Sequence, residues 1–376
     1  MSSCGSVVIL GGGVQGLTLA WFLAREGCKV RLIDRQACGR EASWAGAGII
    51  PPGQASDSSP VTDRLRSLSS GLFFKMSEDL LALTGIDNGY RICGAWHLAD
   101  DQGSLDQVIR LCQVERLAHE VVQEPLVRHR LDWLGPDVPA ACFVAQTAQV
   151  RNPWHLKALE AACRKSGVVI NDHVSVGKLI VERNRISSIE TSEGMIHGDQ
   201  FALTAGAWSC GLAASVNVVL PVRPVQGVIV LLECLYSHFS SIIEQGKRYI
   251  VPRGDGLFLV GSNEVEIGFD KTVNPQTVEE LEAWAQQMVP GLLNARRVTS
   301  WAGLRPGSPD GAPFLGMCPN IENLFLATGH YRAGLQLSPG SATLVADVML
   351  GRKPAVPIDP FSPLRPEGFL PRGFNN

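Results

Sequence analysis

The sequence predicts an α/β fold combined with a second lobe of α+β type. Three observations lead to this fold class. A glycine-rich turn joins a β-branched strand to an apolar helix near the N-terminus, a second strand ends in an acidic residue, and the pattern changes to mixed short strands and helices between residues 60 and 145. The 376 residues, 45% of them apolar and 18% charged, suffice for about two globular domains.

The first predicted element is a buried strand that leads through a glycine-rich turn into a helix. Residues 7–9 are β-branched, and residues 11–16 match G-x-G-x-x-G. Residues 7–24 form an uncharged run that is just long enough for a marginal membrane span. The glycines and the change to a helical pattern favour a strand, a turn and a helix instead. Such a turn lets a pyrophosphate approach the backbone at the N-terminus of the helix.

The second strand, residues 29–33, ends at Asp34. A carboxylate at this position would hold the hydroxyls of a ribose and would repel a 2′-phosphate, so NAD or FAD fits better than NADP. The following run, residues 40–52, is small between Ala45 and Gly48, which allows backbone amides to lie against a planar ring or a diphosphate. A doubly wound NAD dehydrogenase would usually continue with a helix and a strand here, so the run favours FAD.

The rest of the chain predicts a discontinuous layout. We interpret residues 60–145 as an insertion, after which a helix at 153–165 and strands at 168–170 and 201–204 resume the βαβ pattern. Strands at 225–232, 249–252 and 257–261 and a polar helix at 277–288 follow. We therefore predict an FAD-binding, Rossmann-like domain from residues 1–80, 145–220 and 304–376. Residues 81–144 and 221–303 would form a substrate-binding domain on a mixed or antiparallel sheet.

The C-terminal third contains a strand at 323–328, a glycine-rich loop at 329–335, and a helix that opens at Ser338 and Pro339. If the N-terminus of this helix faces a flavin, its dipole stabilises the negative charge of the reduced ring.

Composition excludes several classes of function. The formal net charge of -3 gives no general attraction to nucleic acids or anionic membranes. The ten cysteines form no CxxC and no metal-spaced cluster, and we interpret them as thiols in a reducing compartment. No secretory signal is evident at the N-terminus. We therefore expect a cytoplasmic protein with no metal, no nucleic-acid partner and no stable membrane insertion.

Seven segments, taken together and in this order, resemble the bacterial glycine oxidases. They are residues 11–16, 39–48, 150–153, 205–209, 249–253, 301–307 and 329–332. This family belongs to the FAD-dependent D-amino-acid oxidase group and is associated with thiazole synthesis for thiamine. The segments extend over essentially the whole chain, and 301–307 with 329–332 is the most discriminating pair.

The resemblance implies site residues. Arg305 would bind the substrate carboxylate, a role that suits the planar fork of a guanidinium. Tyr249 would donate a hydrogen bond to the same carboxylate, and Arg332 would be a second arginine near the site. FAD, bound non-covalently, would contact the following residues: Gly11, Gly13, Val14, Gln15, Gly16, Asp34, Arg35, Ser43, Trp44, Ala45, Ala47, Gly48, Ile49, Val174, Ala205, Gly206, Trp208, Tyr331, Arg332, Gly334 and Leu335. We interpret His330 as a packed histidine without a role as a base.

The implied reaction is transfer of the α-hydrogen of glycine, sarcosine or a small D-amino acid as hydride to flavin N5. The products would be glyoxylate or another 2-oxo acid, ammonia and, with molecular oxygen as acceptor, hydrogen peroxide. Relatives of this kind are commonly homotetramers. Three alternatives stay open: a D-amino-acid dehydrogenase that passes electrons to a quinone, an FAD-binding protein without activity, and an NAD dehydrogenase.

Overall fold

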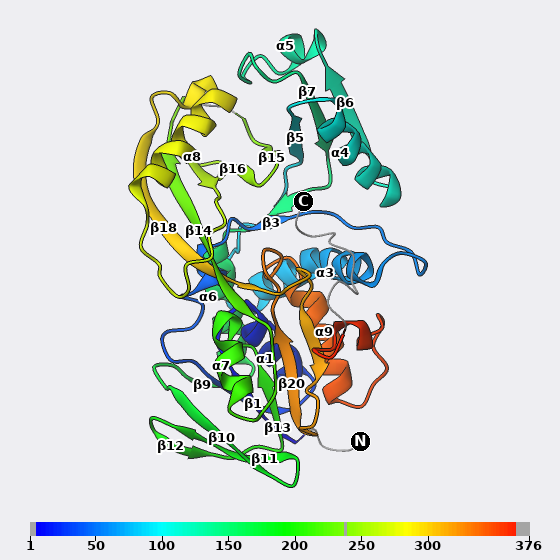
Figure 1. Ribbon diagram of the computed structural model, residues 1–376, viewed down its shortest axis with the longest axis vertical. Coiled ribbons are helices and arrows are strands. Elements are labelled where there is room, and N and C mark those ends of the chain that lie inside the picture. Colours follow the sequence, from blue (N-terminus) through cyan, green and yellow to red (C-terminus); the bar gives the residue numbers. More distant parts are fainter. Residues whose placement is uncertain (1–4, 237–238, 366–376) are drawn as a thin grey trace.

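Two large β-sheets divide the molecule into a lower and an upper lobe (Figure 1). A computed structural model describes residues 5–236 and 239–365, so the ends of the predicted domains at 1–4 and 366–376 lie outside the described residues. The mixed α/β architecture matches the predicted fold class.

The lower lobe contains a six-stranded sheet in the order β19-β20-β13-β1-β2-β9. Every neighbouring pair is parallel except β19 with β20. The central strands are buried apolar runs, as expected for a parallel sheet that is covered on both faces. The strands are β1 (Ser6–Leu10), β2 (Lys29–Ile33), β9 (Val169–Asn171), β13 (Gln200–Leu203), β19 (Phe314–Met317) and β20 (Leu324–Thr328).

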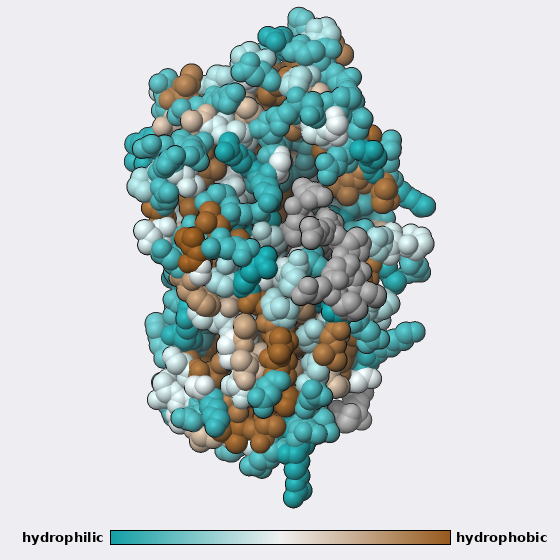
Figure 2. Space-filling model, in the orientation of Figure 1, coloured by the Kyte–Doolittle hydropathy of each residue, from teal (hydrophilic) through white to brown (hydrophobic). Residues whose placement is uncertain are grey.

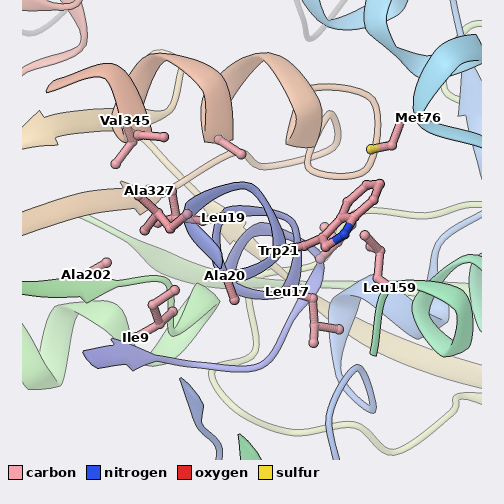
Figure 3. Close-up of a cluster of buried hydrophobic side chains, with 14 of the residues drawn as sticks. Ile9, Leu17, Leu19, Ala20, Trp21, Met76, Leu159, Ala202, Ala327 and Val345 are labelled. Carbon is pink, nitrogen blue, oxygen red and sulfur yellow. The ribbon is translucent and has the colours of Figure 1, made fainter. Parts of the chain in front are cut away.

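Four helices build the main core of this lobe. They are α1 (Val14–Arg25), α3 (Val61–Thr84), α6 (Asn152–Lys165) and α9 (Ser338–Met349). Figure 3 shows Trp21 of α1 close to Met76 of α3 and Leu159 of α6, and all three side chains belong to one buried cluster. Because α1 is apolar on nearly all sides, it is buried between its neighbours and does not span a membrane.

The other face of this sheet packs on a smaller layer. It contains the antiparallel strands β10 (Val176–Glu182), β11 (Arg185–Thr191) and β12 (Gly194–Ile196) and the short helix α7 (Ser209–Ala214). Three single-turn 3₁₀ helices span Gly206–Trp208, Pro290–Leu292 and Asp359–Phe361.

The upper lobe contains an eight-stranded sheet in the order β18-β14-β17-β16-β15-β5-β7-β6. All neighbouring pairs are antiparallel except β15 with β5, so the predicted mixed or antiparallel sheet is present. The strands are β5 (Ala95–Ala99), β6 (His119–Gln123), β7 (Ala140–Val144), β14 (Arg223–Glu233), β15 (Ile242–Gln245), β16 (Arg248–Pro252), β17 (Leu257–Gly261) and β18 (Arg296–Gly307).

Helices pack on both ends of the eight-stranded sheet. Helix α8 (Pro275–Met288) lies against β14 and β17, and α4 (Gln102–Val114) lies against β5 and β7. Asp101 caps α4 by accepting a hydrogen bond from the backbone of Ser104, which explains where this helix begins. The short helix α5 (Leu126–Arg130) follows β6.

A small sheet of β3 (Ile49–Ile50), β8 (Ala148–Gln149) and β4 (Arg91–Ile92) lies where the chain passes between the two lobes. The short helix α2 (Ala42–Ala45) precedes it and packs against β18. Strand β18 is continuous through residues 303 and 304, where the sequence analysis places a domain boundary.

Hydrophilic residues predominate on the face of the upper lobe in Figure 2, with apolar residues interspersed. Among residues 5–236 and 239–365, no helix has the length and apolar character needed to cross a membrane. Eight of the described cysteines are free thiols, whereas Cys28 is in a disulfide, and Cys4 lies outside the described residues. The prediction that every cysteine is a thiol is therefore wrong for Cys28.

Candidate active site

A large cavity of about 1170 Å³ is lined by residues of both lobes. Residues after β1 and β2 line it from the lower lobe, and residues of β16 and β18 line it from the upper lobe. In an α/β sheet, ligands bind beyond the carboxyl ends of the strands where the strand order reverses. Strand β1 lies between β2 and β13, so the cavity is at this position of the sheet.

The turn before α1 depends on its glycines. Gly11 has a φ of +116°, and a Cβ there would lie 2.7 Å from the carbonyl oxygen of Thr204. A Cβ on Gly16 would overlap the carbonyl group of Gly11. The first helical residue, Val14, donates its backbone N–H to Ser43 Oγ at 2.9 Å. The turn therefore brings the N-terminus of α1 to the cavity, where its N–H groups and dipole favour a diphosphate.

Asp34 is held beside this turn. Its Oδ2 accepts a hydrogen bond from the backbone N–H of Gly12 at 2.7 Å, and its Oδ1 accepts one from Gln36 at 2.9 Å. Burial raises the pKa of the Asp34 carboxyl above its ordinary value, although both hydrogen bonds oppose this shift. The next residue, Arg35, places its guanidinium 3.8 Å from the centre of the Trp208 ring. The Asp34 carboxylate can therefore bind a ribose, and the stacked pair of Arg35 and Trp208 lines the same cavity.

A second backbone cradle surrounds Gly48, which has a φ of +75°. A Cβ at this position would overlap the carbonyl oxygen of Val150. The Gly48 carbonyl accepts a hydrogen bond from Val150 N at 2.9 Å, so the turn is fixed to the strand beside it. The small residues that the sequence analysis assigned to the flavin ring therefore form a rigid wall of the cavity.

Arg253, which follows β16, supports this wall from behind. Its Nη2 donates to the Ala47 carbonyl at 2.7 Å, and its Nη1 donates to Gln149 Oε1 and to the Val150 carbonyl, each at 2.9 Å. The side chain is buried, and burial lowers the pKa of Arg253 to about 9. A buried cation with three acceptors fixes the position of all three segments.

The guanidinium of Arg305 lines the cavity from β18. Its Nη2 donates to Ser262 Oγ at 2.7 Å, and its Nη1 donates to the carbonyls of Asn263 at 3.1 Å and Gln226 at 3.3 Å. Within the described part of the chain, no carboxylate forms an ion pair with it. Burial lowers the pKa of Arg305 below its ordinary value, so the site gains from a bound anion.

Glycines on the neighbouring strands make room for this arginine and for Tyr249. A Cβ on Gly227 would overlap the guanidinium of Arg305, and a Cβ on Gly261 would lie 2.6 Å from the hydroxyl of Tyr249. Tyr249 is buried and lines the same cavity as Arg305. The two side chains therefore face the same cavity, and their charges interact.

His330 also lines the cavity and is 1% exposed. Its Nε2 lies 3.0 Å from Ser341 Oγ, and burial lowers the pKa of His330 to about 3. The imidazole is therefore neutral near pH 7.

The predicted site residues come together in this cavity, with two exceptions. Gly16 lies behind the turn, and Trp44 packs against Trp301 with a ring separation of 5.2 Å. The residues that line the cavity are Gly11, Gly13, Val14, Gln15, Asp34, Arg35, Ser43, Ala45, Ala47, Gly48, Ile49, Val174, Ala205, Gly206, Trp208, Tyr249, Arg305, Tyr331, Arg332, Gly334 and Leu335.

The sequence analysis missed three residues that support the site. Arg253 is the last residue of the segment 249–253, which carries part of the family resemblance, but the sequence analysis gave it no role. Ser262 and Glu264 follow β17 in a segment that is not part of the resemblance. No pattern of neighbouring residues marks Glu264, because its position beside Lys247 follows from the pairing of β16 with β17.

Comparisons with known proteins agree with this geometry. The family described as FAD dependent oxidoreductase matches residues 6–348. The chain is 37% identical to "Glycine oxidase" of Pseudomonas putida over 97% of this chain and 99% of that protein. It is 31% identical to "Bifunctional protein ThiO/ThiG" of Trichormus variabilis over 92% of this chain and 53% of that protein. The crystal structure of glycine oxidase from Geobacillus kaustophilus superimposes with a TM-score of 0.90 at 30% identity, covering 96% of this chain and 99% of that one.

Proposed function

Since the chain belongs to the FAD-dependent oxidoreductases, in the group that contains the glycine oxidases, we propose that it oxidises glycine with oxygen as the electron acceptor. Glycine, oxygen and water would be converted to glyoxylate, ammonia and hydrogen peroxide. Sarcosine and small D-amino acids are further candidate substrates. FAD is the cofactor of this family.

The observation that carries this proposal is the partly buried guanidinium of Arg305 in the same cavity as the dinucleotide cradle. A cation held by three hydrogen bonds, which the described residues leave without an ion-paired carboxylate, suits an α-carboxylate. Tyr249 lines the same cavity and supplies a hydroxyl donor. The remainder of a small amino acid would then be held within the cavity, which supports an amino-acid substrate.

The residues of this chain would act by binding and orienting. Arg305 and Tyr249 hold the carboxylate, so that the α-carbon is presented in one orientation, an effect that can supply much of a rate enhancement. When bound, FAD supplies the acceptor for the α-hydrogen and two electrons. His330 stays neutral near pH 7, so it adds no positive charge to the cavity.

The fit of FAD is supported by the cavity wall itself. The carboxylate of Asp34 would hold the ribose, the N-terminus of α1 would hold the diphosphate, and the backbone around Gly48 and Gly334 would hold the ring. We propose non-covalent attachment, because the motifs around Arg305 and Arg332 contain no cysteine.

We further propose that the protein serves thiazole synthesis for thiamine, in the cytoplasm and as a homotetramer. The pathway rests on the family resemblance and on the similarity to a protein named ThiO/ThiG. The oligomeric state and the compartment rest on the resemblance alone, and size-exclusion chromatography with light scattering tests the former.

The experiment that tests the function is an anaerobic visible spectrum of the purified holoenzyme before and after addition of glycine. We expect loss of the oxidised flavin band, and its return when air is admitted. A band that glycine leaves unchanged would refute the substrate. A band that glycine bleaches but oxygen restores only slowly would favour a dehydrogenase that uses a quinone.

A further inference from the structure

The two arginines of the cavity differ in their partners. Arg305 is bound by carbonyl and hydroxyl oxygens and has no carboxylate partner among the described residues. The Nη1 of Arg332, in contrast, lies 3.2 Å from Oε1 of Glu264, and its Nη2 donates to the carbonyl of Lys247 at 3.2 Å. Among the described residues, the site therefore presents one guanidinium without an ion pair and one that is already paired.

Glu264 connects the groups around Arg332. Its Oε2 accepts a hydrogen bond from the ammonium of Lys247, and the hydroxyl of Tyr331 also bonds to this carboxylate. The Glu264 side chain is only 11% exposed. Burial raises the pKa of Glu264, but the hydrogen bond from Lys247 and the charge of Arg332 outweigh this effect, and the pKa lies below its ordinary value. Glu264 is therefore a partly buried anion next to a cavity-lining cation.

We propose that Glu264 determines substrate specificity by neutralising Arg332, so that the site accepts amino acids with one anionic group and rejects those with two. This inference rests on the proposed function. A single carboxylate finds its counter-charge at Arg305. A second carboxylate that approached Arg332 would meet the negative charge of Glu264, and like charges repel strongly where water is excluded.

The position of Lys247 is consistent with this assignment. Its side chain is 55% exposed, whereas that of Arg332 is 23% exposed, so solvent screens the charge of the lysine more than that of the arginine. Glu264 is the carboxylate that pairs directly with Arg332. Removing its charge while keeping its shape would give the cavity a second available cation.

The first test compares E264Q with the wild type and with E266Q as a matched control. Glu266 is 58% exposed and pairs with Arg223, away from the cavity. We expect E264Q to raise the ratio of kcat/KM for iminodiacetate to that for glycine by about tenfold or more, and E266Q to leave it unchanged. An unchanged ratio in E264Q, or an equal rise in E266Q, would overturn the proposal.

The second test does not depend on glycine being the substrate. Acetate and malonate, which cannot be oxidised as amino acids, are titrated into the oxidised holoenzyme, and binding is followed by the change in flavin absorbance. The wild type should prefer acetate, and E264Q should shift the preference towards malonate. A wild type that prefers malonate would overturn the inference even if E264Q did not fold.

Two double variants identify the cation that becomes available to a second carboxylate when Glu264 loses its charge. The shift towards malonate should disappear in E264Q/R332Q and persist in E264Q/K247M. If it disappears with K247M and persists with R332Q, the lysine carries the effect and the assignment to Arg332 is wrong. If glycine fails to bleach the flavin while the acetate and malonate preferences behave as expected, only the proposed substrate fails.

Discussion

Arg253 donates a hydrogen bond from Nη2 to the carbonyl oxygen of Ala47 at 2.7 Å, across 206 positions of the chain. This bond ties the end of β16 in the upper lobe to the turn that lines the cavity from the lower lobe. The guanidinium also binds Gln149 and Val150, so one buried side chain fixes three segments of the cavity wall. Arg253 therefore links the small-residue wall of the cavity to the strand that carries Tyr249.

Replacement of Arg253 by Met should therefore loosen the cradle. Three buried acceptors lose a charged donor, and we expect the free energy of unfolding to fall by about 2–4 kcal/mol. The FAD dissociation constant, measured by fluorescence titration of the apoprotein, should rise. R248M is the control, because Arg248 is exposed at the other end of β16. Equal FAD affinity in R253M and the wild type would contradict the bracing role.

Gly16→Ala tests the turn before α1. The added Cβ overlaps the carbonyl of Gly11, so helix and turn must separate, at a cost of about 1–3 kcal/mol. We expect weaker FAD binding and a lower Tm. Gly71→Ala in the interior of α3 is the matched control, since nothing lies near its Cβ, and it should be neutral or stabilising by up to about 1 kcal/mol. A variant at Gly16 that binds FAD normally would be evidence against the close packing.

Arg305→Met should abolish anchoring of the substrate carboxylate. Removing one partner of a hydrogen-bonded charge pair costs about 2–5 kcal/mol, so we expect kcat/KM for glycine to fall by roughly a hundredfold or more. Arg305→Lys should recover only part of the activity, because an ammonium does not reproduce the planar fork. The flavin spectrum and the Tm report whether the fold survives, and unchanged acetate binding in R305M would refute the role of this residue.

His155 predicts an acid-sensitive fold. It is buried beside Phe73, its Nδ1 lies 3.1 Å from Asn88 Nδ2, and burial lowers the pKa of His155 from 6.5 to about 3. The unfolded chain therefore binds the proton first, so stability is complete above pH 6.5 and decreases as the pH falls towards 3. The slope contributed is about 1.4 kcal/mol per pH unit. H155Q should have a flatter profile in urea unfolding between these limits, and a profile parallel to the wild type would contradict this assignment.

Much of the lower lobe could be predicted because its signals are local. The uncharged run with a G-x-G-x-x-G turn predicts β1 and α1, and the structure places the strand at Ser6–Leu10 and the helix at Val14–Arg25. The strand at 29–33 is present with the predicted bounds. Periodicity, turn residues and caps are properties of neighbouring positions, so the sequence displays them directly.

The supporting contacts of the site could not be predicted in the same way. The bond from Arg253 to Ala47 and the ion pair from Arg332 to Glu264 join residues far apart in the chain, and neither has a pattern of its own. Lys247 and Glu264 are neighbours because β16 and β17 form an antiparallel pair with Tyr249 opposite Gly261. That register follows from the pairing of strands, which one sequence does not specify.

The interleaved layout of the two large sheets limits how this protein can be recombined with its relatives. The upper sheet takes strands from residues 95–144 and 223–307, and the lower sheet takes strands from residues 6–33, 169–203 and 314–328. A chimera with a single crossover between residues 33 and 314 therefore mixes parents within at least one sheet and breaks a native strand interface. Exchange of a whole upper lobe requires several crossovers, placed in the connections between the sheets.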